Sequence, residues 1–136
     1  MPLIVVGLDV AGVETRATGF CTLNNMKAET LIVHADDEIL KRTRAISPQV
    51  VAIDAPLSLP PGRQSIDQIT NVHLRECGRE LLRRGIRFFP TTLGPMRKLT
   101  VRGMNLKRTL QNENFMVIEV PPWWDTGLVG HCEETA

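Results

Sequence analysis

The stretch Ile4-Val5-Val6-Gly7-Leu8-Asp9-Val10-Ala11-Gly12 joins a short apolar run to a carboxylate and then a glycine. β-Branched and aliphatic residues over 3–9 predict a buried strand. A second run at 50–56, Val-Val-Ala-Ile-Asp-Ala-Pro, has the same form. Its apolar residues predict a central parallel strand over 50–54. Each predicted strand therefore carries an aspartate near its end.

The segment between these two runs predicts a hairpin and a helix. Residues 17–24 and 29–34 read as strands, and the Asn-Asn-Met-Lys link at 24–27 suits a tight turn because Asn tolerates left-handed backbone. Three consecutive acids at 36–38 favour a helix start, where free N–H groups are positive. The helix is predicted to run to about residue 46, before a Ser-Pro pair.

The second half of the chain predicts two helices and a last strand. Apolar spacing indicates a long helix over 67–84, ended by a glycine. Residues 87–90 read as extended, and Pro95 suits the start of a helix that runs to about 112. Residues 116–120 form the fifth predicted strand. Short right-handed connections then predict a mixed five-stranded α/β sheet of order about 3-2-1-4-5 with flanking helices, which places Asp9 and Asp54 at one end.

Length and composition narrow the class of protein. A chain of 136 residues predicts a single domain, 1–136, and 43% hydrophobic with 23% charged residues is typical of soluble globular proteins. The three cysteines are far apart and form no CxxC, which indicates neither a disulfide framework nor a zinc ribbon. We find no signal peptide and no apolar run of membrane-spanning length. These features predict a cytoplasmic protein with no membrane partner.

The two aspartates are the candidate metal ligands. Neighbouring ionised carboxylates repel, and Mg²⁺ or Mn²⁺ relieves that repulsion because hard cations select oxygen ligands. Glu119, near the end of the fifth strand, is a third candidate. The alternatives are that Asp9 and Asp54 cap turns and that Glu119 is an exposed charge at a strand end.

A basic middle region suggests an anionic partner. Residues 63–108 hold 11 lysines and arginines and three acids. Arg75, Arg79 and Arg83 recur every four residues and can follow phosphates, or they can pair locally with neighbouring glutamates. Arg97, Lys98 and Arg102 follow the Thr91-Thr92 turn, where a helix N-terminus can bind phosphate or simply be capped.

Four segments, 7–12, 50–60, 75–108 and 117–120, resemble the DUF429 family of predicted nucleases, which is similar to the ribonuclease H-like fold. The resemblance implies that Asp9 and Asp54 are the metal acids of the first and fourth strands. It also implies that Glu119 is the strand-ending acid. By the same resemblance, Arg75 and the segment from Thr91 through Thr92 to Arg97 would line the cleft.

After residue 120 the chain departs from the family, which continues into a helical region. Ribonuclease H-like nucleases take a last acid from a C-terminal helix, which the tail 121–136 does not match. We expect a metal-dependent nuclease that hydrolyses phosphodiesters of DNA or RNA. The alternatives are an ATP-dependent phosphotransferase of the actin-like or sugar-kinase type and a non-catalytic nucleic-acid-binding module. A bare sheet edge would favour a homo-oligomer.

Overall fold

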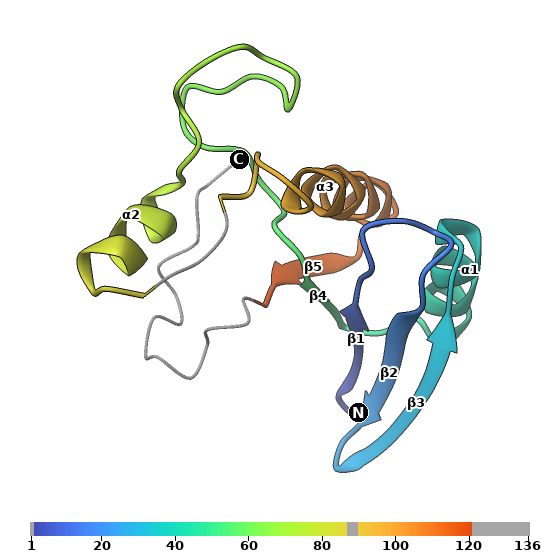
Figure 1. Cartoon of the computed structure of the whole chain (residues 1–136). Coiled ribbons are helices and arrows are strands. Elements are labelled where there is room, and N and C mark those ends of the chain that lie inside the picture. Colours follow the sequence, from blue (N-terminus) through green and yellow to red (C-terminus); the bar gives the residue numbers. More distant parts are fainter. Residues whose placement is uncertain (1, 87–89, 121–136) are drawn as a thin grey trace.

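Five strands form one mixed sheet in the order β3-β2-β1-β4-β5 (Figure 1). The structure, a computed structural model, describes residues 2–86 and 90–120. The antiparallel neighbours are β1 (Ile4–Asp9), β2 (Thr18–Asn24) and β3 (Lys27–Val33). The parallel members are β1, β4 (Val50–Asp54) and β5 (Met116–Glu119). The predicted α/β sheet and its strand order are confirmed.

The hairpin between β2 and β3 turns at an asparagine, as its sequence predicts. Asn25 has a φ of 53°, in the left-handed region that asparagine tolerates. Its backbone N–H donates to the Leu3 carbonyl oxygen at 3.0 Å, and its Oδ1 accepts the Leu3 N–H at 3.2 Å. The turn is thereby tied to the start of β1. The third strand begins at Lys27, two residues before the predicted start.

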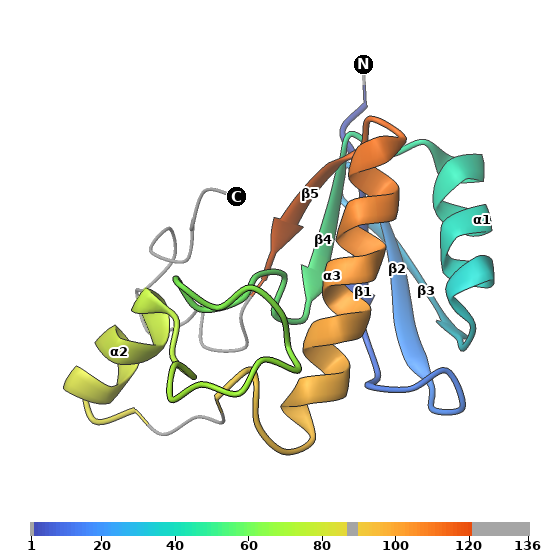
Figure 2. The ribbon, with the colours of Figure 1, turned by 90° about the horizontal axis from the view of Figure 1, so that it is seen from above.

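Two helices cover the same face of the sheet (Figure 2). They are α1 (Asp36–Ile46) and α3 (Met96–Asn112). α1 opens with three acids, as predicted, and ends at Ser47, whose φ is 51°. Alternate strand residues on that face form the core with both helices: Val6, Leu8, Phe20, Val33, Ile39, Val51, Ile53, Leu106 and Leu110.

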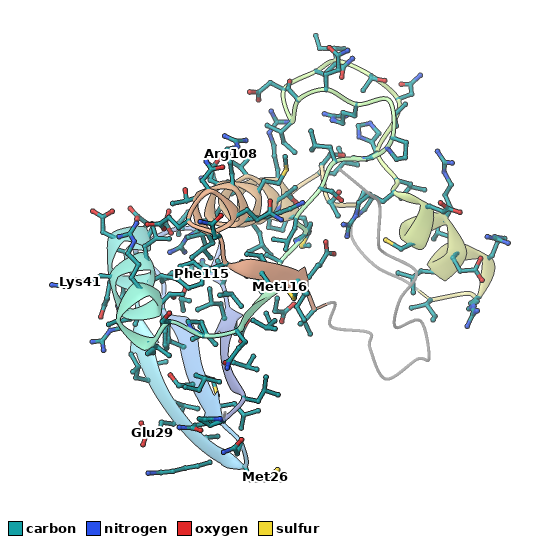
Figure 3. The ribbon with its side chains drawn as sticks, turned by 180° about the vertical axis from the view of Figure 1, so that it is seen from behind. Met26, Glu29, Lys41, Arg108, Phe115 and Met116 are labelled. Atoms are coloured by element: carbon teal, nitrogen blue, oxygen red, sulfur yellow. The ribbon has the colours of Figure 1, made fainter. Side chains whose placement is uncertain are left out.

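α3 approaches the loop after β4 closely at one position. A Cβ placed on Gly103 would lie 2.7 Å from the carbonyl oxygen of Pro56 and 3.0 Å from Cβ of Ala55. Only glycine therefore permits this distance between helix and loop. On the opposite sides of the two helices, Lys41 of α1 and Arg108 of α3 point away from the sheet (Figure 3).

The long helix predicted over 67–84 is wrong in its first half. The observed helix, α2, spans Glu76–Arg83, and residues 67–75 are irregular. The cause is buried Arg63, whose guanidinium donates to the carbonyl oxygens of Ser65, Ile66 and Val72 at 2.6–3.0 Å. These bonds shape the segment as a loop, and the β-branched residues in it have low helix propensity.

Two predicted features lie outside the described residues. The extended segment 87–90 falls there except for its final proline, and so does the tail 121–136. Among the helices that the structure describes, none combines the length and apolarity needed to cross a bilayer.

Candidate metal centre

Asp9 and Asp54 end the two central parallel strands side by side. They are directly paired in the β1–β4 register, so their side chains emerge on the same face of the sheet. Adjacent strands lie about 4.8 Å apart, and two carboxylates on strands at this separation can share one cation. The predicted placement of both acids at one end of the sheet is confirmed.

The environment of the pair makes ionisation of Asp54 costly. Burial raises the pKa of the half-buried Asp54 above its ordinary value, and the charges of Asp9 and then Glu119 raise it further. Asp9 is exposed. A cation between the carboxylates would remove the repulsion and offset the desolvation of Asp54. The two acids are therefore candidate ligands of a divalent metal ion.

The pair lies at one end of an open trough. The trough has a volume of about 520 Å³ and lies on the sheet face opposite α1 and α3. Small residues form its floor at Gly7, Gly19 and Ala52. A Cβ on Gly19 would lie 3.4 Å from Cβ of Asp9, so this glycine leaves free space beside the first carboxylate.

Glu119, the predicted third ligand, does not join the two aspartates. It is paired with Ile53, one residue before Asp54, so its side chain leaves β5 on the opposite face. Within the described ranges no three His, Cys, Asp or Glu side chains are close enough to hold a metal ion. Here the structure brings together two of the three predicted ligands.

Glu119 instead forms a buried ion pair with Arg75. The two guanidinium nitrogens donate to the two carboxylate oxygens at 2.7 and 2.6 Å, and the side chains are 2% and 13% exposed. Glu119 Oε2 also accepts the Leu57 N–H at 3.0 Å, and Arg75 donates to Ser58 Oγ at 3.1 Å. The ion pair thus fastens the loop that follows Asp54.

The three arginines predicted to follow phosphates do not lie on one helical face. Arg75 precedes α2 and is buried, whereas Arg79 and Arg83 are exposed on the helix. Arg83 pairs with Glu80. Arg75 and Arg83 are therefore paired with acids of the chain itself.

The turn before α3 directs its hydroxyls inward. Thr91 and Thr92 are buried; Thr92 Oγ1 lies 2.8 Å from Nδ1 of His73, and the Thr91 carbonyl accepts the Thr100 hydroxyl at 2.6 Å. Thr91 Oγ1 has no hydrogen-bond partner among the described residues. These contacts make the threonines part of the packing of the turn.

Two cations follow that turn and differ in their surroundings. Arg97 pairs with Asp67 of the loop before α2. Lys98 is exposed, and a Cβ on Gly12 would lie 3.9 Å from its Cβ. Of the predicted phosphate-binding residues, Lys98 is placed beside the loop that leaves Asp9.

Arg102 is bonded to the loop that follows Asp9. Its side chain is buried, and it donates to the Ala11 carbonyl at 2.7 Å, the His34 carbonyl at 2.6 Å and the Asp36 carboxylate at 2.8 Å. These bonds tie the loop after Asp9 to the end of β3 and the start of α1. Because Arg102 is buried and bonded within the chain, it does not fit the predicted role of binding a phosphate.

A sequence signal for the burial of Arg102 existed. The residue lies on the apolar stripe of its helix, three residues after Leu99 and four before Leu106. An arginine on an apolar stripe indicates a buried, paired side chain.

No protein-family model, curated protein or solved structure matches the chain.

Proposed function

We propose that this chain is a divalent-metal-dependent nuclease that hydrolyses the phosphodiester backbone of DNA or RNA. The observation that carries the proposal is the direct pairing of Asp9 with Asp54 on the ends of parallel strands. The raised pKa of Asp54 supports it, because perturbed carboxyl groups concentrate at functional sites.

Mg²⁺ or Mn²⁺ fits this pair of ligands. Mg²⁺ is commonly held by one or two carboxylates, with waters and substrate phosphates as the other ligands. A bound ion of this kind supplies Lewis-acid polarisation of the phosphate and an activated water. Asp9 and Asp54 would hold it, and two protein ligands leave room for substrate oxygens.

The surrounding residues keep the two acids in place. The Arg75–Glu119 ion pair holds the loop after Asp54, and Arg102 holds the loop after Asp9. Both acids are thus fixed on their strands and on the loops that follow. Lys98, exposed beside the loop after Asp9, is the cation best placed to attract a phosphate.

A cleavage assay tests the proposal. The purified chain is incubated with Mg²⁺ or Mn²⁺ and end-labelled single- and double-stranded DNA and RNA. We expect metal-dependent cleavage that Asp9→Asn and Asp54→Asn each reduce by more than about 100-fold, because even outer-shell partners of a metal contribute about 10–100-fold. The matched control is Asp37→Asn, which neutralises an exposed acid of α1.

The control variant should cleave at the wild-type rate. Absence of cleavage of all four substrates with either metal would reject the nuclease proposal. Cleavage that survives both aspartate substitutions would show that another site or a contaminant carries the activity.

A non-catalytic nucleic-acid-binding module is the second candidate. The observation that favours it is that only two acids converge among the described residues. This candidate predicts binding whose affinity falls steeply with salt, with no turnover. The same substrates, followed by fluorescence anisotropy, distinguish the two candidates.

A further inference from the structure

β3 is the outer strand at one edge of the sheet (Figure 1). Its seven residues pair with β2 without a bulge, and they include neither proline nor glycine. Natural sheets often protect an edge with prolines, bulges or a covering element, because unpaired backbone groups bind other strands. In the described part of the chain no strand pairs with the outer side of β3, and residues 27–32 are all exposed. This edge is therefore open to a further strand.

The hydrogen bonds of the sheet determine which residues of β3 present free backbone groups. The Asn25 N–H donates to the Leu3 carbonyl oxygen, in register with the β1–β2 pair, so the odd-numbered residues of β2 bond to β1. Bonding residues alternate along an antiparallel strand, so the even-numbered residues of β2 bond to the odd-numbered residues of β3. The N–H and C=O groups of Ala28, Thr30 and Ile32 therefore point to the open edge.

These three residues are complementary to a second copy of the same strand. If two β3 strands pair antiparallel about a two-fold axis at Thr30, Ala28 of each copy lies opposite Ile32 of the other. Every outward N–H of one strand then meets an outward C=O of the other. The large Ile32 side chain packs beside the small Ala28, and the two Thr30 side chains form a Thr–Thr pair, which stabilises antiparallel strands.

The charges on β3 favour the same arrangement. Pairing about Thr30 sets Lys27 opposite the last residue of β3 in the second copy, three residues before the acids at 36–38 that open α1. The Lys27 side chain is 79% exposed, and its ion pair with Glu29 of the same strand is weak because both groups are solvated. A register centred on Glu29 would instead place this acid of the two copies face to face, which is unfavourable.

We propose that the chain forms a two-fold symmetric dimer in which the β3 strands of two copies pair antiparallel about Thr30. The pairing joins two five-stranded sheets into one continuous sheet. Because the two-fold axis is perpendicular to the sheet, the acid pairs of both copies lie on the same face of the dimer. The dimer does not depend on metal binding or on nuclease activity.

Sedimentation velocity of the full chain over a wide range of concentrations measures this association. We expect a reversible equilibrium between monomer and dimer. Thr30→Pro should raise the dimer dissociation constant by more than about tenfold, because two main-chain bonds are lost, one from each copy. The Thr30 N–H points away from β2, so proline is compatible with the folded strand. Thr30→Val is the matched control, because it keeps the N–H and the shape, and it should dimerise nearly as well as wild type.

A second pair of variants distinguishes the edge of the sheet from its open face. Ile32 and Ile118 both lie on the face that carries the acid pair, and they are 61% and 45% exposed. Ile32→Lys places a charge within the paired strands and should abolish the dimer. Ile118→Lys is the same substitution on β5, at the other edge of the sheet, and should leave the dimer unchanged. If circular dichroism shows that Thr30→Pro is unfolded, this pair decides.

Three outcomes overturn the proposal. In the first, the wild-type chain sediments as a monomer at every concentration. In the second, a dimer forms but survives both Thr30→Pro and Ile32→Lys. In the third, the dimer is lost with Ile118→Lys and kept with Ile32→Lys, which identifies the open face as the interface. A dimer that is weakened by Thr30→Pro and Ile32→Lys, and kept with Thr30→Val and Ile118→Lys, supports it.

Discussion

Removing Arg75 should leave Glu119 as an unpaired charge inside the protein. The variant Arg75→Met keeps a long apolar side chain and deletes all bonds from the guanidinium. Those bonds include two to Glu119, at 2.7 and 2.6 Å, and one to Ser58 at 3.1 Å. The carboxylate, 13% exposed, keeps the Leu57 N–H as a donor. Removing one partner of a buried ion pair lowers the free energy of unfolding by about 3–5 kcal/mol.

The double variant Arg75→Met/Glu119→Gln should be more stable than Arg75→Met alone. The glutamine amide carries no charge, so the desolvation cost disappears, and its oxygen still accepts the Leu57 N–H. The double variant should still be about 1–3 kcal/mol less stable than wild type, because the hydrogen bonds of the guanidinium are missing. A second substitution that restores stability is the signature of a buried charge pair.

Equilibrium unfolding in urea, followed by circular dichroism, measures these differences. With a slope of about 1–3 kcal/mol per molar urea, Arg75→Met should lower the midpoint by at least about 1 M. Arg83→Met is the matched control, because the Arg83 side chain is 73% exposed and its ion pair with Glu80 should contribute less than about 1 kcal/mol. A buried charge pair is excluded if Arg75→Met matches this control, or if the double variant is no more stable than Arg75→Met.

Three further variants test other parts of the structure. Gly103→Ala should lower the free energy of unfolding in urea by about 1–3 kcal/mol, because the alanine Cβ would lie 2.7 Å from the Pro56 carbonyl oxygen. A variant more stable than wild type would contradict that contact. Without metal, Asp54→Asn should be more stable than wild type at pH 7. Because the folded-state pKa of Asp54 is raised, wild-type stability falls as pH rises from about 3.9 through that pKa. Asp54→Asn should lack this decline in thermal melts over pH, and an equal decline in both proteins would exclude Asp54 as its source. Arg63→Met should speed limited proteolysis of the loop up to Val72 by releasing three carbonyls, and an unchanged cleavage rate would contradict its role.

The sheet and the acid pair were predictable because their signals are local. An apolar run that ends in Asp9 or Asp54 identifies both a strand and the polar residue at its end. Short connections then restrict the strand order to few choices. Once the two strands are predicted to be neighbours and to run in the same direction, their terminal aspartates must lie at the same end of the sheet.

The position of Glu119 could not be predicted in the same way. A shift of one residue in the β4–β5 register moves its side chain from one face of the sheet to the other. The sequence of the strand is apolar on both sides, so it does not specify that register. The partner that fixes Glu119 is Arg75, 44 residues away in the chain.

The loop before α2 was mistaken for a helix for a related reason. Apolar residues at helical spacing suggested a buried stripe over 67–84, yet Ile69 is fully exposed. The determinant is Arg63, whose bonds to backbone carbonyls replace helical ones. Side-chain to backbone bonds of this kind leave no periodic pattern in a sequence.

Anomalous diffraction from a crystal soaked in Mn²⁺ shows whether Asp9 and Asp54 bind one metal ion together. We predict a Mn²⁺ peak between Asp9 and Asp54, within about 2.6 Å of a carboxylate oxygen from each. Two strand-end aspartates that turn away from each other, or a crystal with Mn²⁺ bound only elsewhere, would contradict it.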